Sequence, residues 1–290
     1  RGLGDVYKRQ LLMIPNMYKM AGELLPAVIH CSARALAGHA LSIFGDHQDV
    51  MATRQTGFAM IATSSVQEVM DLAGVAHIVA LKSRVPFLHF LGSEMCIRDS
   101  QKIELIDEAA LTAMLDRDAL KAFRQRALNP EHPVTRGTAQ NPDIYFQTRE
   151  ASNPFYDAVP DMVADAMREI SKITGREYKP FVYYGAADAE NIVIAMGSVT
   201  ETLKETVDYL NAKGGKVGVV TVHLYRPFSV KYMMEVLPES VKRICVLDRT
   251  KEPGANGDPL YLDVVEAFAT CPCKNKPLII GGRYGLSSKD

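Results

Sequence analysis

The sequence has little net charge, few cysteines and no long apolar run, and each absence argues against a class of protein. A formal net charge of -1 gives no electrostatic reason to expect a nucleic acid or an anionic membrane as partner. No apolar stretch approaches the ~20 residues that a membrane-spanning helix needs, and no basic-then-apolar leader is apparent. Five cysteines lack the spacing of a disulfide framework, so we expect a reducing compartment, the cytoplasm.

What is present indicates a globular α/β protein. The 290 residues are 47% hydrophobic and 23% charged, enough for one large or two ordinary domains. Helical spacing alternates with short apolar strands, which predicts parallel sheets. In the first part we predict helices at 11–22, Gly57–Val69, Met70–Val79 and Glu108–Ala127, strands at Leu25–His30 and Val85–Phe90, and a loop or helix at Ser32–Ile43.

The segment 128–157 differs from its surroundings because it is rich in Asn, Pro, Gly and aromatic residues and has few helical signals. Disordered segments are poor in aromatic residues, and long irregular loops are usually functional or linkers. We interpret it as an ordered excursion that contacts another domain or subunit. A helix at Asp157–Thr174 follows, closed by Gly175.

A second unit begins near Pro180. Three or four β-α units in about 100 residues predict a small parallel sheet. The predicted strands are Asn191–Val199, Lys216–Val222, Ile244–Asp248 and Leu278–Gly281, and the predicted helices are Glu201–Ala212, Val230–Leu237 and Tyr261–Ala269.

Polar residues are dense behind the apolar run that ends at Ile29, and such density is typical of a pocket floor. Arg34 comes first, and the loop Gly45–Asp49 follows. His47 either hydrogen-bonds a ligand or is a partly exposed histidine paired with Asp46 or Asp49. Arg54 and its neighbours Gln55 and Thr56 either shape the pocket or cap a following helix.

We expect no metal site. His30, His39 and His47 have no tight ligand pair beside them. Cys271-Pro272-Cys273 cannot supply four tetrahedral ligands and lacks the longer spacings of iron–sulfur clusters, so we interpret it as a surface loop with two free thiols.

Many long strings in one order carry a family resemblance. LLMIPNMYKMAGELLPAVIH, SARALAGHALSIFGDHQDV, RQTGFAM, NPEHPVTRGTAQNPDIYFQ, HLYRPF, VLDRTKEPGANGDPLYLDV and GGRYGLSSKD resemble pyruvate:ferredoxin (flavodoxin) oxidoreductase over residues 11–90 and 101–290. The resemblance implies two parallel-sheet α/β domains. Residues 11–180 would be part of the thiamine pyrimidine-binding domain with an extended linker, and 181–290 an incomplete transketolase C-terminal-like domain.

Two segments interrupt this pattern. RGLGDVYKRQ (1–10) and LGSEMCIRDS (91–100) look like translated sequencing-adaptor read-through rather than native protein. In the family, 91–100 would be an Asp-Gly-Phe-Arg-Thr-Ser-His-Glu type loop. An ordinary variable loop is the alternative for this second segment.

The resemblance also implies an activity. The family decarboxylates pyruvate oxidatively with coenzyme A to acetyl-CoA and CO2, using thiamine diphosphate with Mg2+. Electrons pass through [4Fe-4S] clusters to ferredoxin or flavodoxin. The clusters and the diphosphate- and magnesium-binding domain would lie outside this chain. We therefore expect an internal fragment of a homodimeric enzyme, inactive alone.

Matched onto the family's SAR motif, Arg34 corresponds to the arginine that holds the pyruvate carboxylate. A guanidinium offers a planar fork that matches a carboxylate and stays charged. His47, Asp49 and Arg54 are further candidates for the pocket. Two alternatives stay open: an oxidoreductase for another 2-oxoacid, or a noncatalytic assembly module.

Overall fold

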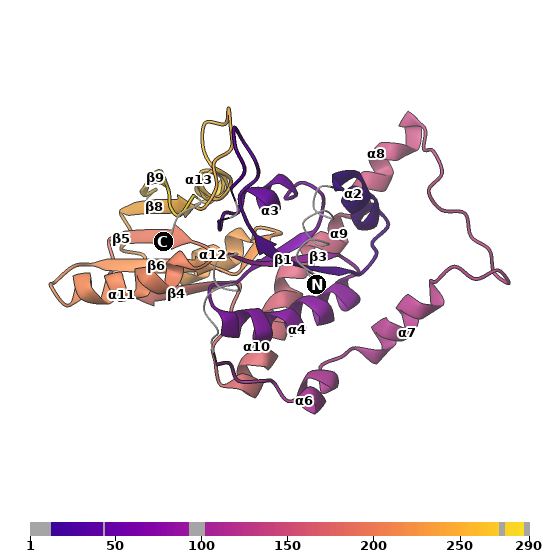
Figure 1. The fold of residues 1–290 in the computed structure, drawn as a ribbon, viewed down its shortest axis with the longest axis horizontal. Coiled ribbons are helices and arrows are strands. Elements are labelled where there is room, and N and C mark those ends of the chain that lie inside the picture. The colour runs from indigo at the N-terminus through magenta and orange to yellow at the C-terminus, as the bar shows by residue number, and fades with distance from the viewer. Residues whose placement is uncertain (1–12, 43, 93–101, 273–275, 287–290) are drawn as a thin grey trace.

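The strands form two sheets in the computed structural model, which describes residues 13–42, 44–92, 102–272 and 276–286. Figure 1 shows the sheets beside each other, with an arm of chain extending from the first. The first sheet has the order β1-β3-β2-β7 and the second β4-β6-β5-β8-β9. The strands of the two sheets are β1 Val28–Ala33, β2 Ala59–Ala62, β3 Phe87–Gly92, β4 Phe181–Gly185, β5 Asn191–Ala195, β6 Val217–Val222, β7 Leu224–Arg226, β8 Arg243–Asp248 and β9 Leu278–Arg283.

Helices cover the sheets and build the arm. They are α2 Ile14–Gly22, α3 Gln48–Ala52, α4 Val66–Ser83, α6 Glu108–Ala113, α7 Arg117–Gln125, α8 Pro142–Glu150, α9 Asn153–Asp157, α10 Val159–Thr174, α11 Val199–Asn211, α12 Val230–Val236 and α13 Pro259–Thr270. No described helix combines the length and apolarity that a bilayer crossing requires.

The predicted α/β class with two mostly parallel sheets is confirmed. In the first sheet β1, β3 and β2 are parallel, and in the second β6, β5, β8 and β9 are parallel. Two strands run the other way: β4 is antiparallel to β6, and β7 is antiparallel to β2. Since β7 comes after β4–β6 in the chain, the second half of the sequence supplies a strand to the first sheet.

Two hydrophobic clusters form the core. One lies between the first sheet and the helices α4 and α10, with Phe87, Val75 and Met167 fully buried. The other joins side chains of both sheets, from Phe90 to Ile194 and Val246. Because this second cluster is continuous, the sheets pack on each other. The division into domains near residue 180 stays a prediction.

Several predicted elements need correction. Gly57–Val69 is not a helix, because β2 occupies part of it and α4 begins only at Val66. The helix predicted at Glu108–Ala127 is two helices, because the Asp116 side chain accepts from the Ala119 N–H and starts α7 anew. The strand predicted at Leu25–His30 is shifted to β1.

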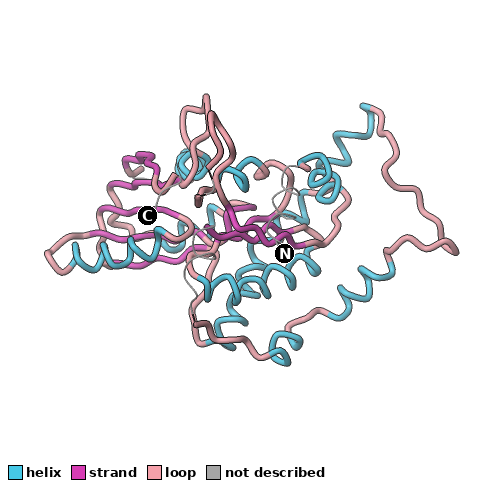
Figure 2. The backbone as a smooth tube through the Cα atoms, in the orientation of Figure 1, coloured by secondary structure: helices cyan, strands magenta, loops and turns pink. Residues whose placement is uncertain are grey.

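The arm, residues 102–157, carries α6 to α9, with a long connection between α7 and α8 (Figure 2). The prediction that 128–157 has little helix is wrong, because α8 and α9 lie in it. Beyond the arm, α10 ends at Thr174 as predicted, with Gly175 at φ 71° and its N–H donating to Ser171 O over 2.9 Å. Segment 1–10 and most of 91–100 lie outside the described residues, while Leu91 and Gly92 end β3.

Candidate functional site

Arg34 follows the last residue of β1, at the carboxyl end of a parallel strand. Its backbone forms an isolated antiparallel bridge with Gly45, and its N–H donates to Asp49 Oδ2 over 3.2 Å. The Ala35 N–H donates to Phe44 O over 3.1 Å. These bonds fold the segment after β1 back on itself and hold a half-buried arginine at the sheet edge. This edge is where ligands bind in open parallel sheets.

His47 is buried, with 1% of its surface exposed. Its ring lies edge-on to Phe90 at 5.4 Å between centroids, and neither ring nitrogen has a hydrogen-bond partner. Burial, and then the nearby charge of Arg249, lowers the pKa of His47 to about 3. The imidazole is therefore neutral near pH 7. The interpretation as a partly exposed histidine paired with Asp46 or Asp49 is wrong.

The second sheet brings its own polar residues to this place. Arg249 follows β8, Ser198 precedes α11, and Tyr284 follows β9. Arg249 Nη1 donates to Ser198 Oγ over 2.9 Å, and its Cζ lies 5.5 Å from the centre of the Tyr284 ring. The Tyr284 hydroxyl donates to Met196 O over 2.7 Å. The carboxyl ends of strands in both sheets thus meet around one buried arginine.

Glycines make room for that arginine. A Cβ built on Gly45 would lie 2.9 Å from Arg249 Nη2, and one built on Gly92 would lie 3.0 Å from Nη1. At Gly285 the same atom would lie 2.7 Å from Nε. Gly92 belongs to the segment 91–100 that we expect to be non-native. Arg249 itself is only 2% exposed, so any added side chain at these positions would meet it.

Of the other candidates, Asp49 lies in the site and Arg54 lies beside it. Asp49 is buried, and its Oδ1 accepts from the Val50 N–H over 2.7 Å. Arg54 pairs with Glu252 at 2.6 Å and donates to Met51 O over 2.8 Å, so it ties α3 to the segment after β8. Thr56 caps no helix, because its hydroxyl donates to Thr53 O and β2 follows.

Sequence reasoning missed Arg249, Ser198 and Tyr284. The available signal was their position directly after apolar runs that become parallel strands, the same signal that singled out Arg34. Cys271, interpreted as a free thiol, is disulfide-bonded, so that interpretation is wrong. Its neighbour Cys273 lies outside the described residues. Within the described residues no group of three or more His, Cys, Asp or Glu side chains could hold a metal ion.

Comparison with known families identifies the chain. Residues 10–168 match the family model described as "Pyruvate flavodoxin/ferredoxin oxidoreductase, thiamine diP-bdg". This chain belongs to the pyruvate flavodoxin/ferredoxin oxidoreductase family. Residues 189–285 match a second model, "Pyruvate:ferredoxin oxidoreductase core domain II".

Full-length members of this oxidoreductase family are close in sequence. The chain is 62% identical over 280 residues to a pyruvate-flavodoxin oxidoreductase of Enterobacter agglomerans and 60% identical to a pyruvate:ferredoxin oxidoreductase of Moorella thermoacetica. Both alignments cover 97% of this chain and 24% of the relative. The chain thus spans about a quarter of the length of these relatives.

A solved structure supports the fold alone. The 2-oxoglutarate:ferredoxin oxidoreductase from Magnetococcus marinus superimposes with a TM-score of 0.55 at 14% identity. The match covers 95% of this chain and 49% of that chain.

The residues present fit one side of a thiamine diphosphate oxidoreductase site. A half-buried cation, Arg34, and a buried neutral imidazole, His47, lie at the carboxyl edge of the first sheet. The two ring nitrogens of His47 are orphaned polar atoms that a bound organic group could satisfy. The metal side does not fit the described residues, which hold no cluster of metal-ligating side chains.

Proposed function

We propose that this chain is part of an enzyme that oxidatively decarboxylates pyruvate with coenzyme A to acetyl-CoA and CO2. The observation that carries the proposal is the position of Arg34 at the carboxyl end of β1, inside a segment matching a thiamine diphosphate-binding family. Ferredoxin or flavodoxin accepts the electrons, as the names of the relatives state for those proteins.

Arg34 binds the carboxylate of the 2-oxoacid. A guanidinium makes two parallel N–H···O bonds to a carboxylate and so fixes its orientation as well as its position. The bond from the Arg34 N–H to Asp49 fixes the backbone from which that side chain extends. Correct alignment of reacting groups can supply several kcal/mol of barrier reduction. Arg34 therefore orients the ketone carbon.

The buried residues His47 and Asp49 hold the loop that carries Arg34 in place. The neutral ring of His47 offers one donor and one acceptor nitrogen without adding charge. When bound, thiamine diphosphate supplies the nucleophilic carbon and electron sink that decarboxylation of a 2-oxoacid needs. Its diphosphate, Mg2+ and the [4Fe-4S] clusters are held by polypeptide outside this chain.

The enzyme is a homodimer in the cytoplasm. The arm supports an interface, because its apolar side chains Ile144 and Phe146 are 48% and 67% exposed. Exposed large hydrophobic groups in clusters are typical of protein contact surfaces. Light scattering of the intact enzyme tests the dimer.

The test of the substrate role uses the intact enzyme that carries this segment. Arg34→Ala should raise KM for pyruvate about 100-fold, since a charged hydrogen bond contributes about 1.5–3 kcal/mol. Arg34→Lys should recover part of the loss, because it restores charge without the fork. Arg168→Ala, on the exposed face of α10, is the control.

Unchanged KM and kcat in Arg34→Ala would remove this residue from the site. A panel of 2-oxoacids, with 2-oxobutyrate and 2-oxoglutarate beside pyruvate, tests the substrate. The 290-residue chain alone should not turn over pyruvate, and turnover by it would contradict the assignment of essential parts to the remaining polypeptide.

A further inference from the structure

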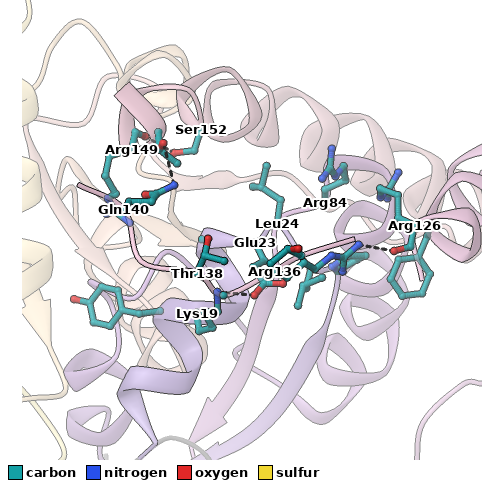
Figure 3. A pocket seen from close by; sticks show the side chains of 18 of the residues that line it. Lys19, Glu23, Leu24, Arg84, Arg126, Arg136, Thr138, Gln140, Arg149 and Ser152 are labelled. Carbon is teal, nitrogen blue, oxygen red and sulfur yellow. Dashed lines mark hydrogen bonds and ion pairs between the residues drawn. The ribbon is translucent and has the colours of Figure 1, made fainter. Parts of the chain in front are cut away.

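A cavity of about 1070 Å³ lies between the arm and the body of the molecule (Figure 3), and Arg34 is not among the described residues that line it. On the body side it is lined by α2, by the turn Leu24–Pro26 and by Arg84 at the end of α4. On the arm side it is lined by the end of α7, by the connection 135–140 and by α8. The space is of the size that a phosphorylated metabolite occupies.

The lining is cationic. Of the described residues that line the cavity, Glu23 alone is acidic, and the Glu23 carboxylate lies 2.7 Å from Lys19 Nζ. The basic residues of the lining are Lys19, Arg84, Arg124, Arg126, Arg136 and Arg149. Among the described residues no ion pair joins these arginines to a carboxylate, and Arg136 Nη2 donates instead to the backbone carbonyl of Arg126 over 2.5 Å. The cavity thus holds a large excess of positive charge.

Arg84 is held there at a cost. Burial, and then the charge of Arg126, lowers the pKa of Arg84. Its Nε is buried without a hydrogen-bond partner, and its Cζ lies 5.2 Å from the centre of the Phe155 ring. An anion between Arg84 and Arg126 would offset their mutual repulsion and accept from the unpartnered N–H.

The backbone around the cavity is strained. Leu24 has φ 53° and Arg84 has φ 67°, and these are the two non-glycine residues with positive φ within the described ranges. Both line this cavity. Non-glycine residues are uncommon in the left-handed region, and such strain clusters at ligand sites.

Aromatic rings complete the lining. Tyr18, Phe123 and Tyr145 are 38%, 37% and 56% exposed and lie among the basic residues. Half-exposed rings next to cations can stack on a planar heterocycle while the cations bind its phosphates. We propose that this cavity binds a nucleoside polyphosphate, with the phosphates on Arg84, Arg126 and Arg136 and the base on an aromatic ring.

Calorimetric titration of the 290-residue chain with ATP and with inorganic tripolyphosphate tests the proposal, without divalent metal. Each should bind at one site, with an affinity that falls as salt rises. Arg84→Gln/Arg126→Gln should weaken both by about 100-fold, roughly tenfold for each charged contact. If the double variant does not fold, Arg136→Gln, on an exposed connection, replaces it and should weaken both ligands about tenfold. Arg168→Gln on α10 is the control and should bind normally.

The ring contact has its own test. Tyr145→Ala should weaken ATP and leave tripolyphosphate unchanged, and a photoreactive azido-ATP should label the peptides that carry Tyr18, Phe123 or Tyr145. Absence of binding, or binding that the arginine variants do not weaken, would overturn the proposal. So would binding to the 290-residue chain that is lost in the intact enzyme, because the cavity would then be filled by polypeptide.

Discussion

The backbone N–H of His47 donates a 2.8 Å hydrogen bond to the backbone carbonyl oxygen of Arg249, and this bond connects the loop after β1 to the end of β8. Two further interactions extend this contact. Gln48 Nε2 donates a hydrogen bond to Lys251 O over 3.5 Å, and Arg54 forms an ion pair with Glu252. The two sheets are therefore fixed relative to each other where their carboxyl ends meet. We call this set of contacts between residues 47–54 and 249–252 the seam. A substitution in the seam should alter both the stability of the fold and the geometry of the site.

Gly197 should tolerate no side chain. It has φ 85°, and a Cβ there would lie 2.9 Å from His47 Cε1. Gly214 has φ 84° and nothing within 4 Å of the same atom, so it is a matched control. We expect Gly214→Ala to cost about 1 kcal/mol for the left-handed backbone. Gly197→Ala should cost about 1–3 kcal/mol more, because the buried His47 ring would have to shift. Urea unfolding measures both, and equal costs would contradict the contact.

His89 should destabilise the fold at acid pH. Burial, and then His30 and His77, lowers the pKa of His89 to about 3. The unfolded chain takes up this proton near pH 6.5 and the folded chain does not, so the free energy of unfolding falls as pH drops below 6.5. His89 alone should account for about 1 kcal/mol between pH 6.5 and 5.5. Urea midpoints at several pH values measure this slope.

The variant His89→Leu should have a shallower slope over the same pH range. It also removes the contact between His30 Nδ1 and His89 Nδ1 at 2.9 Å, so the slopes with pH are compared and not the absolute stabilities. A slope as steep as that of the parent would show that His89 titrates normally.

The pair His223–Glu68 should stabilise the fold at mildly acid pH, opposite to the effect of His89. His223 Nε2 lies 3.4 Å from Glu68 Oε1, and its Nδ1 contacts Lys179 O at 2.9 Å. Burial opposes the charge of His223, but Glu68 and the carbonyl outweigh it and raise the pKa of His223. Burial likewise opposes the charge of Glu68, but His223 and the Ser64 N–H lower the pKa of Glu68.

The stabilisation from a raised histidine pKa is complete below pH 6.5 and lost as pH rises through the folded value. That from the lowered glutamate pKa is complete above pH 4.5 and lost below it. Glu68→Gln should therefore cost about 1–3 kcal/mol near pH 6 and less near pH 8.5. An equal cost at both pH values, in urea unfolding, would exclude a charged pair.

Arg54 and Glu252 should contribute to the seam between the sheets and not to substrate binding. Their side chains are 18% and 37% exposed, so solvent screens the pair. A double-mutant cycle with Arg54→Ala and Glu252→Ala should give a coupling of about 0.5–1 kcal/mol in the free energy of unfolding. In the intact enzyme the KM for pyruvate should not change in either variant. A raised KM in Arg54→Ala alone would restore this residue to the pocket.

Apolar runs predicted β3 and most of the second sheet, but the short buried strand β2 was mistaken for part of a helix. β2, Ala59–Ala62, is buried at every residue and therefore shows no alternation. β4, Phe181–Gly185, was not predicted at all, and its antiparallel pairing with β6 has no signal in a single sequence. The break at Asp116 was missed because α6 and α7 have no buried residues that fix one continuous face.

The position of Arg34 was predictable, because Arg34 directly follows the apolar strand β1. Its role in binding the substrate stays a prediction. The burial of His47 was not predictable, because Gly197 and Phe90 cover it from distant parts of the chain. The same holds for Arg249, which depends on glycines in three separate parts of the chain. Such packing is decided by tertiary structure, which local sequence does not encode.

The pairing of β7 with β2 makes the two halves of the polypeptide interdependent. Met60 pairs with Arg226 and Ile61 with Leu224, so a polypeptide stopped near residue 180 would leave the unpaired backbone groups of β2 open to water. An uncovered apolar edge of this kind recruits strands from other molecules and leads to aggregation. Expression of the amino-terminal half as a soluble unit therefore requires that residues 224–226 be kept with it.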